Sequence, residues 1–527
     1  MVLMLLFIRN IFLLCSFFCV VQKDIFAQAP LIELANGEPL LLNFQNISAG
    51  NTSTAKPIRF RTANLSSPLI INAPAGFELS KNNVSYFSSI SYAISELTSS
   101  GNTVFIRFKP TENLKGFGGN LEFSSSGIML QRPDLSASSM PDNLSLDIVS
   151  WNLAWFGSEY NGPFDNILQA QLAVRIMDSL RADIYMLQEI VDTALLGYVS
   201  RNIQNGPYEY LVSQYASNAF NTFSGNWRIG QKMAFLYKKN LFSNISSRGY
   251  TATSLNANNY YNWASGRYPF RMDATVNIGG KTKRVGFVNL HAKAELGEPT
   301  DYYRRKGAAD LLYDSLTYQN TDEYVLIGGD FNDDLDETIS QAVNETLTPY
   351  YSFMSDDFRF TPISYWNTLR GDNSYIGYPN VVDHMIATHT MAKDYVPFSC
   401  ILRKEVTDWI PTYRSDVSDH YPIQSRFDFQ QSPSNLITSL HQLTPLKEGI
   451  QVINHFQKDA IIKFLTPVSG SVSIRLIAAD GKMYRNEVLK GINVGSTYQI
   501  PMSQLSSGIY FLTIVSPSGV LSEKLIR

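Results

Sequence analysis

The sequence predicts a mixed α/β domain in the centre of the chain, with an all-β domain on each side. The length of 527 residues suits about three domains. Short alternating apolar runs occur near both ends, whereas strand-like and helical runs alternate in the centre. The net charge of −3 and the 17% of charged residues are typical of a globular protein and exclude a histone-like polycation.

Residues 1–29 are typical of a signal peptide. Arg9 is followed by an apolar run, Ile11–Val21, and then by the small-residue sequence Ala27-Gln28-Ala29. The run is shorter than the roughly 20 residues of a membrane span. We therefore expect export without stable membrane insertion, with an uncleaved anchor as the alternative. Removal of the segment would leave Cys400 as the only cysteine, which excludes an intrachain disulfide.

Residues 30–130 are expected to form a β-sandwich. Short strand-like runs such as Leu40–Phe44 and Thr103–Phe108 are separated by turn residues. Together with Ala73–Ser80, this pattern resembles Ig-like β-sandwiches. We expect the module to act as a spacer, with adhesion or substrate tethering as alternatives. The polar stretch in 131–144 predicts a linker.

Residues 145–429 are expected to form the α/β domain. Leu146–Trp151 has the composition of a buried strand, and apolar residues at i/i+4 spacing predict a helix over Asp165–Arg181. A hairpin is expected around Gly279-Gly280. Further strands are expected at Ile184–Leu187, Met233–Tyr237 and Tyr324–Gly328, and a further helix is expected at Tyr302–Leu316.

Polar residues lie at the ends of the predicted central strands. They are Asn152, Glu189, His291, Asp330, Asn332, Asp383, Asp419 and His420. Strand ends that meet at one edge of a sheet are where α/β proteins place their sites. Carboxylate and amide oxygens suit a hard cation such as Mg²⁺, Mn²⁺ or Ca²⁺, whereas zinc prefers Cys and His. The histidines are then free to donate protons to a phosphate oxygen.

Six motifs containing these residues come in a recognisable order. They are Ser150-Trp151-Asn152, Leu187-Gln188-Glu189, Asn289-Leu290-His291, Gly329-Asp330-Phe331-Asn332, Val382-Asp383-His384 and Ser418-Asp419-His420-Tyr421-Pro422. Together they resemble the endonuclease/exonuclease/phosphatase superfamily, which includes pancreatic-type DNases, abasic-site endonucleases and sphingomyelinases. The resemblance covers residues 146–429, and it implies a four-layer αββα sandwich with a divalent metal between the strand ends.

The resemblance implies a role for each site residue. Asn152 and Glu189 would be metal ligands, and Asp419 a further metal or water ligand. Asp330 would orient or deprotonate the attacking water. Asn332 would hydrogen-bond the water or a phosphoryl oxygen.

The remaining implied roles concern the phosphate. His420, oriented by Asp383, would bind the scissile phosphate. His291 would donate a proton or a hydrogen bond on the leaving-group side. Arg267 matches a phosphate-contacting arginine of DNase-like members. Such members also pair the first histidine with a carboxylate, but the matching position here is Gln231, so the partner of His291 stays open.

Other polar residues have plainer interpretations. We expect His384 and His389 to be structural or surface residues. The acidic run Asp333–Glu337 is interpreted as a solvated helix start rather than as a second metal site. Arg304–Lys306 is either a solvated helix face or a cluster that follows a nucleic-acid backbone.

The predicted function is that of a secreted, metal-dependent phosphodiesterase, a nuclease acting on DNA or RNA. The opening Trp151–Gly157 resembles bacterial extracellular nucleases. The acidic balance of the central domain argues against a broad basic nucleic-acid surface. A sphingomyelinase-like phospholipid hydrolase, or another phosphate-ester hydrolase, is one alternative. A surface adhesin whose central domain only binds is an alternative of another class. We expect a monomer.

The last part of the chain, 443–527, is similar to the type IX secretion sorting domain of Bacteroidota. Asp480–Lys482, Leu505–Leu512 and Glu523–Arg527 carry the resemblance, and a polar linker is expected at 430–442. The resemblance implies recognition by the type IX secretion machinery, followed by release or attachment at the cell surface.

Overall fold

The computed structural model describes residues 29–430, with gaps at 220–224, 320–322 and 357–358, and beyond 449 the strands and short connections up to 526. The predicted signal peptide up to residue 28 and the predicted linker from residue 431 onward lie outside the described residues. The chain divides at residue 431 into two units, which we describe separately. Within the described residues, none of the helices combines the length and the apolar character needed to cross a membrane.

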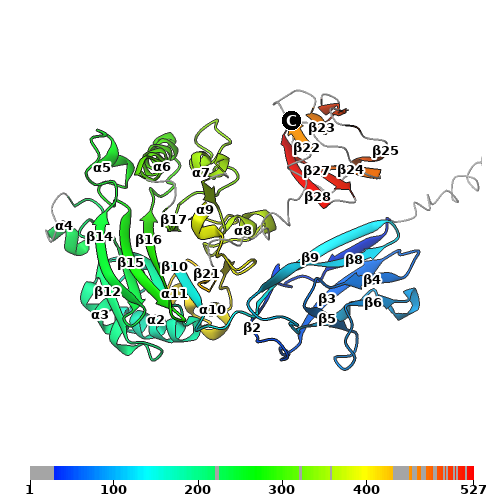
Figure 1. The fold of residues 1–527 in the computed structure, drawn as a ribbon, viewed down its shortest axis with the longest axis horizontal. Coiled ribbons are helices and arrows are strands. Elements are labelled where there is room, and N and C mark those ends of the chain that lie inside the picture. The colour runs from blue at the N-terminus through cyan, green and yellow to red at the C-terminus, as the bar shows by residue number, and fades with distance from the viewer. Residues whose placement is uncertain are drawn as a thin grey trace, which may run out of the picture. The chain divides into compact units, whose positions relative to one another are not determined.

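The first part of the larger unit consists of two sheets (Figure 1). One has four strands in the order β1-β3-β7-β5, and the other has five in the order β2-β9-β8-β4-β6. Alternate side chains of both sheets share one buried apolar core, as the period of two predicts. The elements are β1 (Leu31–Leu34), β2 (Leu41–Asn46), β3 (Lys56–Ala63), β4 (Leu69–Asn72), β5 (Phe77–Ser80), β6 (Ser89–Tyr92), the 3-10 turn η1 (Ile94–Glu96), β7 (Asn102–Phe108), β8 (Gly116–Ser125) and β9 (Ile128–Ser138).

The predicted linker at 131–144 is wrong over most of its length. Residues up to 138 belong to β9, which pairs with β8 on one side and β2 on the other. Leu135 faces the core, but Asp134, Ser136 and Ser138 are also buried, because the central domain packs on the other face of this strand. Because both faces of this strand are buried, its sequence lacks the regular alternation of apolar and polar residues that marks a strand with one exposed face.

Two six-stranded sheets form the central domain. Their orders are β12-β13-β11-β10-β21-β20 and β14-β15-β16-β17-β19-β18, and a single apolar cluster joins their facing sides. The strands are β10 (Ser145–Phe156), β11 (Ile184–Ile190), β12 (Tyr208–Val212), β13 (Lys232–Lys238), β14 (Phe242–Gly249), β15 (Phe270–Ile278), β16 (Lys281–His291), β17 (Val325–Asp330), β18 (Phe360–Thr361), β19 (Asp383–Thr388), β20 (Ile401–Leu402) and β21 (Ile423–Asp428). The hairpin expected at Gly279-Gly280 is confirmed, because β15 and β16 pair across it.

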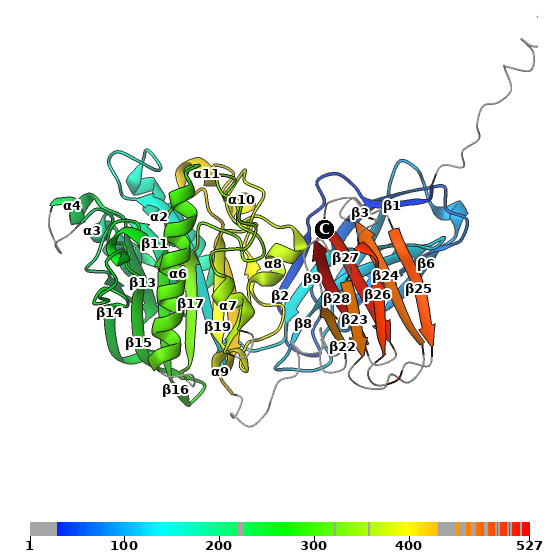
Figure 2. The same ribbon diagram turned by 90° about the horizontal axis from the view of Figure 1, so that it is seen from above.

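Helices pack on the outer side of each sheet. Apolar residues of α2 and α3 form a cluster with β10, β11 and β13, and α6 packs on β16 and β17 and lies across that sheet in Figure 2. The helices are α2 (Asn166–Leu180), α3 (Thr193–Asn202), α4 (Gly225–Ile229), α5 (Asn259–Asn262), α6 (Pro299–Gln319), α7 (Tyr351–Ser355), α8 (Tyr365–Arg370), α9 (His389–Ala392), α10 (Val406–Trp409) and α11 (Tyr413–Asp416). The predicted helix at Asp165–Arg181 is confirmed, with the Asp165 side chain as its N-cap.

The β-sandwich packs directly on the central domain through β8 and β9. The Ser136 hydroxyl donates to the carbonyl of Phe398 at 2.6 Å. Arg370 forms a buried ion pair with Asp134 at 3.2 Å. A Cβ on Gly118 would lie 2.3 Å from the ring of Phe398, so only glycine allows this approach. The two parts therefore share a close-packed seam.

The smaller unit is all-β in its described residues. A three-stranded sheet has the order β22-β23-β26, and a four-stranded sheet has the order β25-β24-β27-β28. Apolar side chains of both sheets form one core. The strands are β22 (Ile450–Ile453), β23 (Ala460–Phe464), β24 (Ser471–Ala478), β25 (Met483–Lys490), β26 (Thr497–Ile500), β27 (Ile509–Ser516) and β28 (Gly519–Ile526).

Candidate active site

Strand register brings the predicted residues to one edge of the paired sheets. Strands β16 and β17 are parallel, with His291 opposite Asp330, and β19 runs antiparallel to β17, with Asp383 opposite Asp330. In the other sheet, β10 and β11 are also parallel and carry Asn152 and Glu189 near the same ends. Parallel strands end at the same edge, so residues far apart in the sequence converge there.

Four side chains form the centre of the cluster. The Nε2 atom of His291 lies 3.4 Å from Asp330 Oδ2 and 3.7 Å from Glu189 Oε1. The Nε2 atom of His420 approaches the same Asp330 oxygen at 3.8 Å. Asp330 therefore lies between the two histidines.

His420 is held by a carboxylate on its other side. Its Nδ1 atom lies 2.8 Å from Asp383 Oδ2, and both side chains are buried. The ring of Tyr375 packs edge-on against the imidazole at a centroid distance of 5.0 Å. The hydroxyl of Tyr413 donates to the backbone carbonyl of His420. These contacts fix the position of the ring.

Asn152 is at the site but presents its amide nitrogen to it. The nitrogen donates to Glu189 Oε1 at 3.1 Å and to Asp330 Oδ2 at 2.9 Å. Its oxygen accepts from the backbone amide of Ala154 at 3.0 Å, which fixes the orientation of the group. The expectation that Asn152 is a metal ligand stays a prediction. In this structure the side chain holds two carboxylates in place.

Two site residues have left-handed backbone conformations. Glu189 has φ of +62°, and Asn332 has φ of +51°. Glu189 Oε2 accepts from the backbone amide of Trp155 at 2.8 Å, and the backbone amide of Asn332 donates to Asp330 Oδ1 at 2.9 Å. A left-handed non-glycine residue costs about 1–3 kcal/mol, and such strain concentrates at functional sites.

Burial and charge shift the pKa values of the cluster. Burial raises the pKa of Asp330 to about 7, with Asp383 adding to the rise and His420 opposing it. Burial also raises the pKa of Glu189. Burial alone would lower the pKa of His420, but Asp383 and Asp330 raise it to about 10. Burial, Arg267 and His420 hold the pKa of His291 well below its ordinary value. One histidine is thus favoured as a cation and the other as a neutral ring.

Arg267 has a different place from the one expected. Its guanidinium donates to the backbone carbonyls of His291 at 2.9 Å and Ala292 at 2.6 Å, and to the side chain of Gln231. The arginine is 4% exposed, and burial lowers its pKa to about 10. The predicted phosphate contact is replaced by a structural one, because Arg267 supports the strand end that carries His291. Gln231 is therefore the partner of Arg267.

A cavity of about 380 Å³ opens at the cluster. Glu189, His291, Asp330, Asn332 and His420 line it, and so does Asp419, as expected from the motifs. Several other lining residues lie outside the six sequence motifs. They are Glu295, Ile339, Tyr375 and Tyr378, which come from loops.

Buried amides support the site from behind. The amide of Gln188 donates to Asn289 Oδ1 at 2.7 Å, and the amide of Asn289 donates to the backbone carbonyl of Leu187 at 2.9 Å. Both side chains are fully buried. Ser418 donates to the carbonyl of Asn152 at 2.6 Å and accepts from the backbone amide of His420 at 3.0 Å. The motif residues next to the predicted ligands thus fix the strand ends against each other.

The acidic run beside the site is not a solvated helix start, contrary to the prediction. Asp333 and Asp334 are buried, and no helix forms there among the described residues. Arg305 is also buried and pairs with Asp333 at 2.9 Å and with Glu295 at 2.6 Å, so neither predicted role holds for Arg305, whereas Lys306 is exposed and pairs with Asp310, as expected of a solvated helix face. His384 is structural, as expected, because its Nε2 lies 2.9 Å from the carbonyl of Val381.

The residues present fit a divalent cation. One ligand atom each of Glu189, His291 and Asp330 lie within 4.8 Å of one another, as do those of Asp330, Asp383 and His420. Two buried atoms at the site, His291 Nδ1 and Asp383 Oδ1, have no hydrogen-bond partner among the described residues. Desolvated carboxylates that share a small space are stabilised by a cation, and oxygen ligands with one imidazole suit Mg²⁺ or Mn²⁺.

Several solved structures are similar to this chain. An endonuclease/exonuclease/phosphatase from Beutenbergia cavernae is 12% identical, with 72% of this chain and 100% of that chain covered and a TM-score of 0.39. The human Nocturnin catalytic domain is 17% identical, with 54% and 94% covered and a TM-score of 0.35. An AP endonuclease from Archaeoglobus fulgidus is 13% identical, with 54% and 99% covered and a TM-score of 0.35. Comparison with curated proteins returned no match.

Two family models match the sequence. The model of the Secretion system C-terminal sorting domain matches residues 456–527, which indicates export by type IX secretion, either into the medium or to the cell surface. The model of the Endonuclease/Exonuclease/phosphatase family matches residues 149–420, which contain the first five motifs of the site and Ser418, Asp419 and His420 of the sixth. Members of that family are hydrolases and are generally dependent on divalent metals. The chain therefore belongs to the endonuclease/exonuclease/phosphatase family and carries a type IX secretion sorting domain.

Proposed function

We propose that the protein is a secreted, metal-dependent phosphodiesterase, a nuclease that hydrolyses DNA or RNA. The observation that carries the proposal is the placement of His420. This buried imidazole is paired with Asp383 at 2.8 Å and faces Asp330 across the cavity. An imidazolium held in this way binds a phosphoryl oxygen and donates a proton to it.

Glu189 and Asp330, with His291 beside them, would hold the cation, and Asp419 would contribute from the cavity wall. A bound divalent cation would stabilise negative charge on the phosphoryl oxygens. Asn152 keeps the two carboxylates in place through its amide nitrogen. Asp330 also accepts from the backbone amide of Asn332, which orients the Asp330 carboxylate toward the cavity.

The histidines would act on opposite sides of the phosphate. His420 favours the cationic form and would bind the scissile phosphate. His291 favours the neutral form, in which one ring nitrogen donates and the other accepts a hydrogen bond. It would contact the leaving group. Asn332 lines the cavity and would donate its amide to a phosphoryl oxygen.

The proposal includes the arrangement of the chain. We propose that 145–429 is a four-layer αββα catalytic domain, flanked by two all-β sandwiches over 30–130 and 443–527. A signal peptide at 1–29 and recognition of the sorting domain by the type IX secretion machinery would deliver the enzyme. The aromatic side chains of Trp155, Tyr375 and Tyr378 line the cavity and support a nucleotide over a lipid as substrate, because bases stack on aromatic rings.

One experiment tests the function. Purified protein is incubated with plasmid DNA, with RNA and with sphingomyelin vesicles, each with Mg²⁺ and with a chelator. We expect hydrolysis of a nucleic acid that stops when the metal is removed. Turnover of sphingomyelin alone would favour a lipid phosphodiesterase. Binding without turnover of any substrate, in a folded sample, would favour an adhesin.

A matched pair of variants tests the site. His420→Asn keeps a hydrogen-bond donor for Asp383 but removes the imidazolium, so we expect activity to fall by roughly 10²–10⁴-fold with little change in melting temperature. His389→Ala, in α9 and outside the cavity, should keep full activity. Full activity of His420→Asn would contradict the role proposed for His420.

A further inference from the structure

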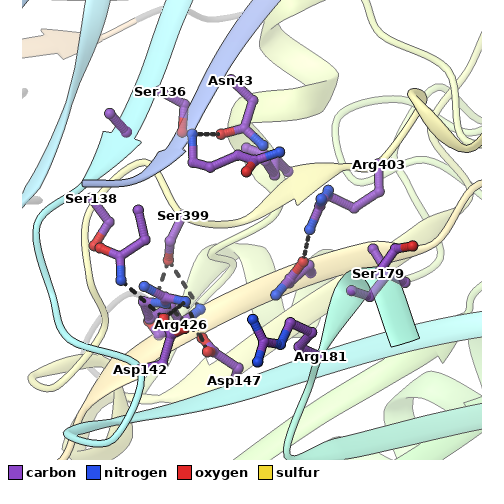
Figure 3. A pocket seen from close by; sticks show the side chains of 16 residues that line it. Asn43, Ser136, Ser138, Asp142, Asp147, Ser179, Arg181, Ser399, Arg403 and Arg426 are labelled. Carbon is purple, nitrogen blue, oxygen red and sulfur yellow. Dashed lines mark hydrogen bonds and ion pairs between the residues drawn. The ribbon is translucent and has the colours of Figure 1, made fainter. Parts of the chain in front are cut away.

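A second cavity, of about 280 Å³, lies at the seam between the β-sandwich and the central domain (Figure 3). It is formed by β2 and β9 of the sandwich, by the end of α2 and by β20 and β21. Asp147 lines it near the start of β10, whereas Asn152 lies five residues further along the same strand. At about 3.3 Å per residue, the two sites are about 17 Å apart. Small-molecule sites often lie at domain interfaces.

The lining of this seam cavity is polar. Only Ala137, Leu180 and Ile401 of its 16 lining residues have apolar side chains, and none is aromatic. A nucleobase or a lipid chain would find nothing here to stack on or pack against. The cavity therefore suits a ligand that is polar on all sides.

One end of the cavity offers an uncompensated positive charge. Figure 3 shows the side chains of Arg181, Arg403 and Arg426 around the same hollow. Arg426 is neutralised by Asp147 at 2.6 Å, and Arg403 by Glu405 at 2.6 Å. The guanidinium of Arg181 has no partner among the described residues and is exposed to the cavity. This end would accept an anionic group.

The cavity also offers a hydrogen-bond acceptor that needs a donor. The Oδ1 atom of Asn46 is buried and has no partner among the residues that the structure describes. Its amide nitrogen donates to Asp142 at 2.9 Å, and the Asp142 carboxylate, which also pairs with Arg426 at 3.0 Å, stays largely exposed. A bare phosphate or sulfate ion has only acceptor atoms and would leave the Asn46 oxygen unpaired. The ligand must carry hydroxyl groups as well as a negative charge.

We propose that the seam cavity binds an acidic sugar, that is, a single sugar ring with free hydroxyls and one carboxylate or sulfate group. The anionic group pairs with Arg181, and the hydroxyls donate to Asn46 and Asp142. Amide side chains such as Gln424 both donate and accept, which matches the mixed demand of a sugar ring. The site gives the β-sandwich a role in attachment to acidic glycans, beyond the phosphodiesterase activity.

The test uses the full chain and ligand-observed NMR with glucuronate, galacturonate, glucose 6-sulfate, neutral glucose, inorganic sulfate and AMP. We expect both uronates or the sulfated sugar to bind at millimolar concentration and glucose to bind at least tenfold more weakly. Equal binding of glucose, or binding of inorganic sulfate as tight as that of the sugars, would overturn the proposal. Tighter binding of AMP, or no binding of any probe, would overturn it as well.

Matched variants locate the site. Arg181→Gln should weaken binding of the acidic sugar by about tenfold or more, since it removes the charge and keeps the chain length. Arg175→Gln, an exposed arginine of α2 outside the cavity, is the control and should bind normally. Asn46→Leu should weaken acidic and neutral sugars alike, by about fivefold. Phosphodiesterase activity should be unchanged in all three. Normal binding by Arg181→Gln would contradict the proposal even if the sugar binds.

Discussion

Replacement of Arg370 by leucine should loosen the seam between the β-sandwich and the central domain. Arg370, in α8, pairs with Asp134 of β9 at 3.2 Å, and the two side chains are 2% and 6% exposed. Asp372 also contacts Arg370, but it keeps Lys404 as a partner when the arginine is removed. Asp134 would keep the amide of Asn120 and the charge of Arg132. The variant therefore leaves one buried carboxylate without its ion-pair partner.

The expected magnitude follows from this burial. Breaking a buried ion pair by removal of one partner costs about 3–5 kcal/mol, because the other charge stays desolvated. At 1.36 kcal/mol per factor of ten, the opening equilibrium of β9 should shift by a factor of about 10² to 10⁴. Hydrogen exchange followed by mass spectrometry measures this opening in peptides from β8 and β9. The control is Lys115→Leu, because Lys115 and its partner Glu112 are 54% and 59% exposed and their pair should contribute no more than about 1 kcal/mol.

The defect should also depend on pH. Burial raises the pKa of Asp134, and Arg370 opposes this rise, so the pKa rises further in the variant. The folded variant then binds a proton that the unfolded chain releases, and its stability falls as the pH rises from the ordinary range of an aspartate through the raised value. Exchange in β9 should therefore be faster at pH 8 than at pH 5, after correction for the intrinsic rate. Asp134→Asn added to Arg370→Leu should restore most of the protection. Unchanged exchange in the single variant, or no rescue in the double variant, would refute the reasoning.

Three further predictions concern the site and the core. Asn152→Asp replaces the amide that donates to Glu189 and Asp330 by a third carboxylate, so activity should fall at least about a hundredfold. If Asn152 only bound the metal, an aspartate would serve equally well and activity would be kept. Activity measured at several Mg²⁺ concentrations distinguishes the two roles. Gly329→Ala should destabilise the domain by at least about 3 kcal/mol in a denaturant titration, because φ is +152° and a Cβ would lie 1.9 Å from the carbonyl oxygen of Leu290. Cys400 is buried, and burial raises the pKa of its thiol, so iodoacetamide should label it only after denaturation, as mass spectrometry would show.

The site residues could be predicted from sequence because strand ends are visible in it. An apolar run followed by one polar residue marks the edge of a buried strand, and His291, Asp330 and Glu189 all follow this pattern. Parallel register then brings them together. Whether a side chain presents its donor or its acceptor to the site depends on neighbours that the pattern does not contain. The backbone amide of Ala154 donates to the side-chain oxygen of Asn152, and the side chain of Gln231 accepts from Arg267.

The errors share one physical cause, which is a polar residue buried by a distant part of the chain. Ser136 and Asp134 suggested a solvated linker, but the Phe398 loop and Arg370 cover them. Asp333 and Arg305 suggested solvated charges, but they lie 28 residues apart and bury each other. Local composition reports the average solvation of a residue type, whereas a specific partner overrides that average.

The geometry of the site is held by the chain itself. The Glu189 carboxylate accepts from Asn152 and from the backbone amide of Trp155, and the Asp330 carboxylate accepts from Asn152 and from the backbone amide of Asn332. These donors partly offset the desolvation of two neighbouring carboxylates, and the left-handed conformations of Glu189 and Asn332 are part of the cost. A cation bound here would therefore meet ligands already fixed in position. Its binding energy would not be needed to order them and would be available to stabilise charge on the phosphate.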